Sequence, residues 1–289
     1  MKIKWEEKFI ELYTKGKVQE AKELKNIHVP SKLYKYQKID ENRLKNLEDG
    51  KLYFSNREHL NDPFDLLPVH YNEDEIIRFL KGEYCPANNL SKLEIISKID
   101  KVLNSFSDHI KILSLSTSIY NIPLWTHYGD NHRGMCIEYD IDNLDRNSDF
   151  YDCLLKVSYI DKKVEITEVL KNTLSNLINN DELKLDSMFL LYFTLTMKHK
   201  SWQYENEWRI ILKSNSGECG IEKSLMKVKS IYLGKDCSKE NIERVIEISK
   251  KLKCKVYKME YSKGIDFRLI PKRYRNFKNF YTFLCLRKF

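Results

Sequence analysis

Glu205, Glu207 and Arg209 are the residues whose types and spacing most directly suggest chemistry in this 289-residue chain. They recur at alternate positions at the start of an apolar run, and alternate residues of a β-strand lie on one face. A strand beginning at Glu205 would place two carboxylates and a guanidinium in a row, with Asn206 and Trp208 on the opposite face. Such a row is typical of active sites that move protons or stabilise developing charge. The alternative is a solvent-facing strand whose charges pair across neighbouring strands, and this segment alone leaves both interpretations open.

A polar loop at 61–65 holds the next set of candidate residues. Asn61, Asp62 and Asp65 stand there beside the apolar Phe64. Asn, Asp and Pro favour turns, so a structural turn is the simpler explanation of the loop. Ligand or metal binding by its carboxylates is the alternative.

Aromatic and titratable residues gather in a predicted loop over 121–134. Trp125, His127 and Tyr128 lie there, and His127 is a candidate acid–base group because an imidazole titrates near neutral pH. Such a loop either packs onto the domain or binds a ligand. Lys198 and Trp202 form a further pair, one turn apart in a predicted helix over 183–202.

The chemistry is narrowed by the motifs that the chain lacks, which include a Walker loop, GxGxxG, GxSxG and HExxH. Carboxylates with aromatics but without these motifs suit reaction at a glycosidic carbon, where a carboxylate stabilises an oxocarbenium-like transition state. A metal-dependent nuclease using Asp62, Asp65, Glu205 and Glu207 is one alternative. A non-catalytic sensor that binds a nucleotide or a phage component is another.

The elements that must position these residues mix helices and strands without βαβ regularity, which favours an α+β fold. Helices are predicted over 4–26 with a break at Gly16, from Asp40 to Gly50, and over 73–82, 91–106, 165–179 and 238–252. Strands are predicted over 33–36, 51–55, 112–118, 135–140, 154–160, 227–233 and 255–259. The expected organisation is an N-terminal helical appendage at 1–30, a core at 31–263 and a basic aromatic tail at 264–289.

Composition and charge restrict the partners and the compartment that we expect for the protein. The net charge of +8 permits an anionic partner without requiring one. The tail interleaves cations with aromatic residues, as single-stranded nucleic acid binders do, although packing of those aromatics onto the domain is the simpler explanation. Seven cysteines without a CxxC pair, a charged start and no apolar run of about 18 residues predict a reduced cytoplasmic protein with no membrane partner and no zinc.

The chain resembles a widespread bacterial domain of unknown function that is similar to abortive-infection (AbiGi-type) phage-defence proteins. The resemblance covers roughly residues 31–260 and implies a role in defence, with a defence partner protein. It is carried by Leu33-Tyr34-Lys35-Tyr36, Asn61–Asp65, Trp125-x-His127-Tyr128 with Gly134 and Glu138, and Lys198…Trp202…Glu205-x-Glu207-Trp208-Arg209.

A more distant resemblance is to ADP-ribosyltransferases. Their strand–helix–Gly–strand opening is similar to residues 33–55, their Ser-Thr-Ser strand to 116–118, and their catalytic Glu-x-Glu to 205–207. The resemblance implies a split, mixed or antiparallel sheet flanked by helices, and NAD as the substrate with no metal. It also implies that Glu207 is catalytic and that Glu205 positions the acceptor, which would be protein or nucleic acid bound through the tail.

The expected site therefore has two kinds of members. Glu207, Glu205 and His127 are the candidate catalytic residues. The candidate substrate-binding residues are Lys35, Tyr36, Ser55, Asn61, Asp62, Asp65, Trp125, Tyr128, Lys198, Trp202 and Arg209.

Overall fold

The computed structural model describes residues 5–66, 68–82, 91–94, 96–97, 99–101, 109–178, 195–214 and 220–274. The chain forms two compact units that interleave in sequence. Unit 1 comprises 1–30, 53–114 and 145–223, and unit 2 comprises 31–52, 115–144 and 224–289. The three-part organisation expected from the sequence stays a prediction.

Unit 2 is built on a mixed sheet. β1 (Lys32–Gln37) and β12 (Lys227–Leu233) both pair antiparallel with β5 (Met135–Asp140). β13 (Lys255–Tyr261) runs parallel to β12, and β14 (Leu269–Arg273) is antiparallel to β13. The parallel pair is connected by α10 (Lys239–Leu252), because a parallel connection needs a crossover. The predicted strands over 33–36, 135–140, 227–233 and 255–259 are confirmed.

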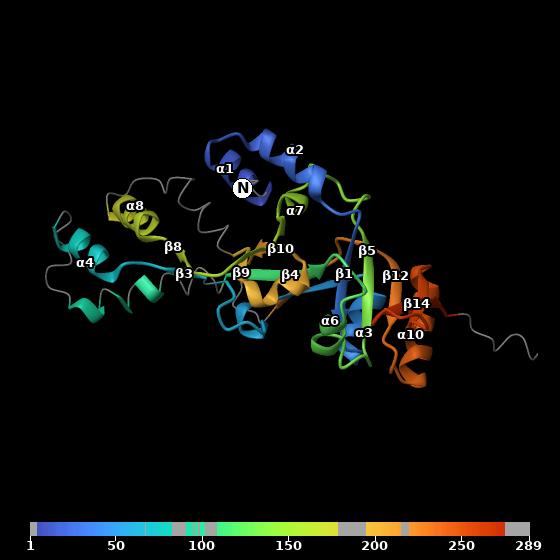
Figure 1. The fold of residues 1–289 in the computed structure, drawn as a ribbon. Helices are drawn as coiled ribbons and strands as arrows, with labels where there is room; N and C mark the ends of the chain where they lie inside the picture. Colours follow the sequence, from blue (N-terminus) through green and yellow to red (C-terminus); the bar gives the residue numbers. More distant parts are fainter. Residues whose placement is uncertain are drawn as a thin grey trace, which may run out of the picture. The chain divides into compact units, whose positions relative to one another are not determined.

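Two helices cover this sheet (Figure 1). α3 (Glu41–Glu48) starts where the Asp40 side chain accepts a hydrogen bond from the Arg43 backbone N–H, as the sequence predicts. Gly50 ends the segment with φ +65°, a left-handed conformation that glycine adopts without strain. α10 packs against α3, β12 and β13.

Unit 1 contains its own strands and the N-terminal helices. β4 (Ile110–Ser116), most of which belongs to unit 1, pairs with β2 (Leu52–Ser55) and β10 (Glu207–Lys213), and β10 pairs with β6 (Leu154–Lys156). α1 (Trp5–Thr14) and α2 (Val18–His28) are separated at Gly16, as predicted. Phe9 and Ala21 of these helices share a core cluster with Ile112 and Ile211, so the N-terminal helices are part of the core of unit 1.

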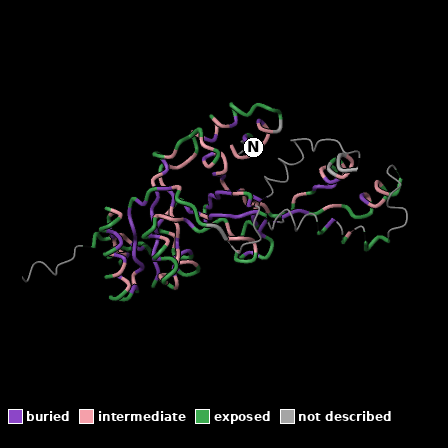
Figure 2. Tube along the Cα trace, turned by 180° about the vertical axis from the view of Figure 1, so that it is seen from behind, coloured by how far each residue is buried: buried purple, intermediate pink, exposed green. Residues whose placement is uncertain are grey.

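A second hydrophobic cluster of unit 1 lies between two further helices. α4 (Glu73–Gly82) and α8 (Thr167–Ile178) contribute Ile76 and Leu170, and the short strands β3 (Val69–His70) and β8 (Val164–Glu165) pair in parallel beside them. Figure 2 shows buried residues concentrated along the strands of both units. The mixed sheet with flanking helices confirms the α+β class.

The structure corrects three local predictions. The loop over 121–134 contains a short helix, α6 (Ile122–His127), because Asn121 caps it and Pro123 occupies its first turn. The strand over 154–160 is two strands, β6 and β7 (Ser158–Ile160). The helix over 183–202 does not reach its predicted end, which forms β9 (Met197–His199) and the 3₁₀ helix η2 (Lys200–Glu205), while 183–194 lies outside the described residues.

The remaining elements are short or only partly described. They are η1 (Arg57–His59), α7 (Asp149–Asp152), β11 (Gly220–Lys223) and helical residues between 92 and 101. The tail is described to residue 274, and 275–289 lies outside the described residues. Within the described part of the chain, no helix is both long and apolar enough to cross a membrane.

Candidate functional site

β10 begins at Glu207, two residues later than the sequence predicts. Glu205 ends η2, and Asn206 has φ +44°, a left-handed conformation that breaks the alternation between residues 205 and 207. Glu207 and Arg209 do share a face of β10, as predicted. That face is buried, with exposed fractions of 3% and 0%, which excludes the solvent-facing strand.

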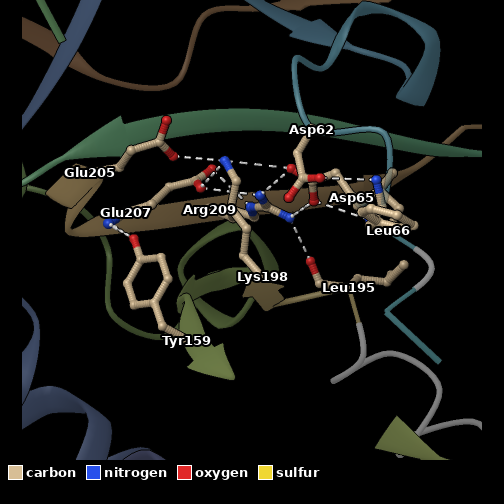
Figure 3. A network of polar contacts seen from close by, with 10 residues as sticks. Asp62, Asp65, Leu66, Tyr159, Leu195, Lys198, Glu205, Glu207 and Arg209 are labelled. Carbon is tan, nitrogen blue, oxygen red and sulfur yellow. Dashed lines mark hydrogen bonds and ion pairs between the residues drawn. The ribbon is translucent and has the colours of Figure 1, made fainter. Parts of the chain in front are cut away.

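Arg209 is the centre of a buried polar network (Figure 3). Its Nη1 and Nη2 donate to the two carboxylate oxygens of Asp65 at 2.6 and 2.7 Å. Its Nε and Nη2 donate to Glu207 at 2.8 and 3.1 Å, and Nη1 also donates to the Leu195 carbonyl at 2.8 Å. Two-point guanidinium–carboxylate pairs are short and directional, so Arg209 fixes both acids.

Lys198, on β9, is the second cation of the network. Its Nζ donates to Glu205 at 2.7 Å and to Glu207 at 3.3 Å, and lies 3.6 Å from Asp65. Its ammonium also lies 4.7 Å from the centre of the Trp202 ring, a cation–π contact. Lys198 therefore links the carboxylates of Glu205 and Glu207, although Glu205 is not part of strand β10.

The network carries three carboxylates and two cations, all of them at most 5% exposed. Burial alone would raise the pKa of Glu207, but Arg209 and Lys198 outweigh it and hold that pKa well below its ordinary value. Burial likewise opposes the charge on Lys198, yet Glu207 and Asp65 keep its pKa above the ordinary value. Glu207 is consequently ionised at neutral pH.

The Asn61–Asp65 loop aims Asp65 at Arg209. Asp62 accepts a hydrogen bond from the Phe64 N–H at 2.9 Å, and its carbonyl accepts one from the Asp65 N–H at 3.0 Å. This Asx turn is the structural turn that the sequence predicts, and it places the Asp65 carboxylate in the network. Asp62 Oδ2 is buried and has no hydrogen-bond partner among the described residues, whereas Asn61 is exposed.

Three groups that form hydrogen bonds with the network were not predicted from the sequence. The Tyr159 hydroxyl accepts a hydrogen bond from the Glu207 N–H at 2.9 Å, and Ser114 hydrogen-bonds to the Glu207 side chain. The third is the Leu195 carbonyl. Serines recur along the chain and tyrosines number 18, and a carbonyl has no side-chain signature, so no sequence signal distinguished these groups.

The other predicted site residues lie outside the network, some in unit 1 and some in unit 2. Ser55, in unit 1, is half-buried opposite Ile112 of β4. In unit 2, Lys35 and Tyr36 are adjacent on β1 and therefore point to opposite faces. The candidate site residues thus fall into two groups, one in each unit.

Tyr36 and Trp125 belong to the packing of unit 2. The Tyr36 hydroxyl donates to the Ser118 carbonyl at 2.7 Å, and the indole N–H of Trp125 donates to the Ile119 carbonyl at 2.9 Å. Their rings meet edge to face at 5.1 Å. His127 is exposed at the end of α6, and Tyr128 is the half-buried residue that follows.

The carboxylates of Asp65 and Glu207 already face cations. Among the residues that the structure describes, no group of three or more His, Cys, Asp or Glu side chains is arranged to hold a metal ion. The network is thus arranged as an ion-pair cluster around an ionised glutamate.

Comparison with known families gives a match over part of the chain. A family model described as a protein of unknown function (DUF2971) matches residues 124–210, from α6 to β10. This range includes Lys198, Glu205, Glu207 and Arg209, but not Asp65. No curated protein and no solved structure matches the chain. The match confirms the likeness to a domain of unknown function, and it does not bear on abortive-infection proteins or ADP-ribosyltransferases.

Proposed function

We propose that the protein is a defence effector that acts on NAD, either cleaving it or transferring ADP-ribose to a protein or nucleic acid. Glu207 is the catalytic residue in this proposal. The observation that carries it is the fixed, ionised carboxylate of Glu207, which is hydrogen-bonded by Arg209 and Lys198.

An ionised carboxylate suits the bond that such an enzyme breaks. Loss of nicotinamide from NAD leaves positive charge on the ribose, and a preorganised carboxylate stabilises that charge. Because Glu207 is buried, its interaction with a developing cation is stronger than in water. Glu205 would position the acceptor, and Lys198 holds its carboxylate beside that of Glu207.

Because the network is buried, NAD can reach Glu207 only if part of the protein moves. Trp202 is half-buried over the ammonium of Lys198, while Lys200, Ser201 and Gln203 of the same η2 helix are exposed. In this proposal η2 moves to admit NAD. The fold would be ADP-ribosyltransferase-like and the protein cytoplasmic, with a defence partner protein; these parts rest on the sequence resemblance.

A non-catalytic sensor is the second candidate, and the closed network favours it. Arg209 and Lys198 neutralise Asp65 and Glu207 within the protein, as in a structural cluster that supports a binding surface elsewhere. A metal-dependent nuclease has less support, because the same cations occupy the carboxylates that would bind the metal.

The experiment is incubation of the purified protein with NAD, followed by chromatography for nicotinamide and by detection of labelled ADP-ribose on protein or oligonucleotide acceptors. We expect turnover for the wild type and for Glu58→Gln, a control at an exposed glutamate of unit 1. We expect no turnover for the Glu207→Gln variant, once circular dichroism has shown that this variant is folded.

The outcomes separate the candidates. NAD binding that survives in Glu207→Gln without turnover by any variant would support the sensor. Absence of turnover, transfer and NAD-dependent thermal stabilisation in the wild type would refute the enzyme.

A further inference from the structure

The two faces of the unit 2 sheet differ in chemistry. Leu33, Ile137 and Ile231 are buried on one face. The opposite face carries tyrosines where the first face carries aliphatic residues. We call Tyr34, Tyr120, Tyr232 and Tyr257 the tyrosine face.

Three rings of the tyrosine face, those of Tyr34, Tyr232 and Tyr257, lie next to one another and come from three strands. Tyr34 of β1 meets Tyr232 of β12 edge on at 6.3 Å, and Tyr232 stacks on Tyr257 of β13 at 5.1 Å. Tyr232 is buried, whereas Tyr34 and Tyr257 are half-buried. Tyr120 is 49% exposed, and the Arg268 guanidinium lies 6.0 Å from its ring centre.

A buried carboxylate holds this face in place. Glu138 of β5 is 2% exposed, and it accepts a hydrogen bond from the Tyr232 hydroxyl at 2.5 Å. Its other carboxylate oxygen lies 3.1 Å from the Lys32 ammonium. Glu138 therefore fixes one ring and one cation, so the stacking surface is preorganised.

Cations surround the rings. Arg273 of β14 lies opposite Tyr257 in the strand register, and Lys255 precedes Tyr257 by two residues on the same face; both are exposed. The Lys32 side chain is 43% exposed. Asp140, two residues after Glu138 on β5, pairs with Lys229 at 3.4 Å. Lys32, Lys255, Arg268 and Arg273 thus supply positive charge around the rings, which complements a polyanion.

We infer that the tyrosine face binds single-stranded nucleic acid, with bases stacked on Tyr34, Tyr120 and Tyr257 and phosphates paired with the surrounding cations. Stacking on aromatic side chains beside a positive track is how proteins bind single strands without reading sequence. The inference does not depend on NAD chemistry, because it concerns a binding surface of unit 2 alone. Within the proposed function, it assigns nucleic acid as the bound polymer.

The test is fluorescence anisotropy of the full chain with a labelled single-stranded oligonucleotide of about 12 nucleotides, within the roughly 4–16 that such surfaces cover. Two variants probe the face: Tyr257→Leu, and the double variant Lys255→Ala with Arg273→Ala. The charge-matched control is Lys239→Ala with Lys250→Ala, which removes two exposed lysines of α10.

We expect the wild type to bind single strands more tightly than a duplex of the same length. Tyr257→Leu should weaken binding about tenfold. The double variant should flatten the plot of log affinity against log salt by roughly 1.4, since single strands release about 0.7 counterion per phosphate contact. The control should stay within about twofold of the wild type.

Three results would overturn the inference. One is absence of binding at low salt, and another is an equal loss in the probe and control variants. The third is affinity for duplex or polyglutamate equal to that for single strands. Circular dichroism and thermal unfolding of each variant separate loss of binding from loss of fold.

Discussion

Arg209 and Asp65, which are 144 residues apart in the sequence, form a two-point ion pair with N–O distances of 2.6 and 2.7 Å. The pair connects the Asn61–Asp65 loop to strand β10 in the interior of unit 1. The same guanidinium holds Glu207, so the conformation of the loop and the position of the proposed catalytic carboxylate depend on one side chain.

Removal of Arg209 should destabilise unit 1 strongly. Arg209→Met leaves the carboxylates of Asp65 and Glu207 buried beside Lys198 alone, and breaking a buried ion pair in this way costs about 3–5 kcal/mol. Urea unfolding measures the loss. The matched control is Arg146→Met, at an exposed arginine of the same unit, and should change stability by less than about 0.5 kcal/mol. Equal stability of the two variants would contradict the network's role.

The ring of Trp202 should stabilise the charged form of Lys198. Trp202→Leu removes a cation–π contact of 4.7 Å and should lower the free energy of unfolding by about 1 kcal/mol. Trp202→Phe keeps an aromatic face and should lose less. If the leucine and phenylalanine variants were equally stable in thermal and urea unfolding, the contact would be only apolar packing.

Asn206 should tolerate glycine but not a β-branched residue. Its φ of +44° lies in the left-handed region, where a β-branched side chain costs about 1–2 kcal/mol. We therefore expect Asn206→Gly to unfold like the wild type and Asn206→Val to be less stable. Lys253→Gly, at φ +53° after α10, should be stabilising by up to about 1 kcal/mol for the same reason. Neutral behaviour of Asn206→Val would show that residue 206 is not held in this conformation.

Lys25 should give unit 1 a stability that increases with pH in alkaline solution. Its Nζ donates to the Tyr151 carbonyl at 2.8 Å, and burial lowers its pKa from 10.5 to about 8. Between these values the unfolded chain keeps a proton that the folded chain has lost, so this group raises the free energy of unfolding as pH rises, by up to roughly 3 kcal/mol. Urea unfolding from pH 7 to 10.5 should show a steeper rise for the wild type than for Lys25→Met. The exposed control Lys45→Met should follow the wild type, and identical slopes for all three proteins would refute the shift.

Most of the elements could be predicted from local signals. The Asp40 cap, the Gly16 break and the strands of unit 2 follow from side-chain chemistry and alternation, which act over a few residues. The predicted end of the helix over 183–202 is wrong because the Lys198 ammonium instead pairs with the carboxylates of Glu205, Glu207 and Asp65. Tertiary contacts of that kind override the helical preference of the local sequence.

The sequence identified the charged residues that form the network but not how they are arranged. Alternation identified Glu207 and Arg209, and turn chemistry identified the loop of Asp65. The sequence could not show that Arg209 joins them, because the pairing spans 144 residues. Nor could it show that Lys35 and Tyr36 belong to a unit separate from that of Glu207.

The most direct test of the central claim is the single-turnover rate of nicotinamide release from NAD by the wild type and by Glu207→Gln, both at saturating NAD and both shown to be folded. Replacement of the ionised carboxylate by a neutral amide of the same shape should lower the rate at least about a hundredfold, while NAD still protects the variant against thermal unfolding. A Glu207→Gln variant that releases nicotinamide as fast as the wild type would contradict the claim that this buried carboxylate performs the chemistry.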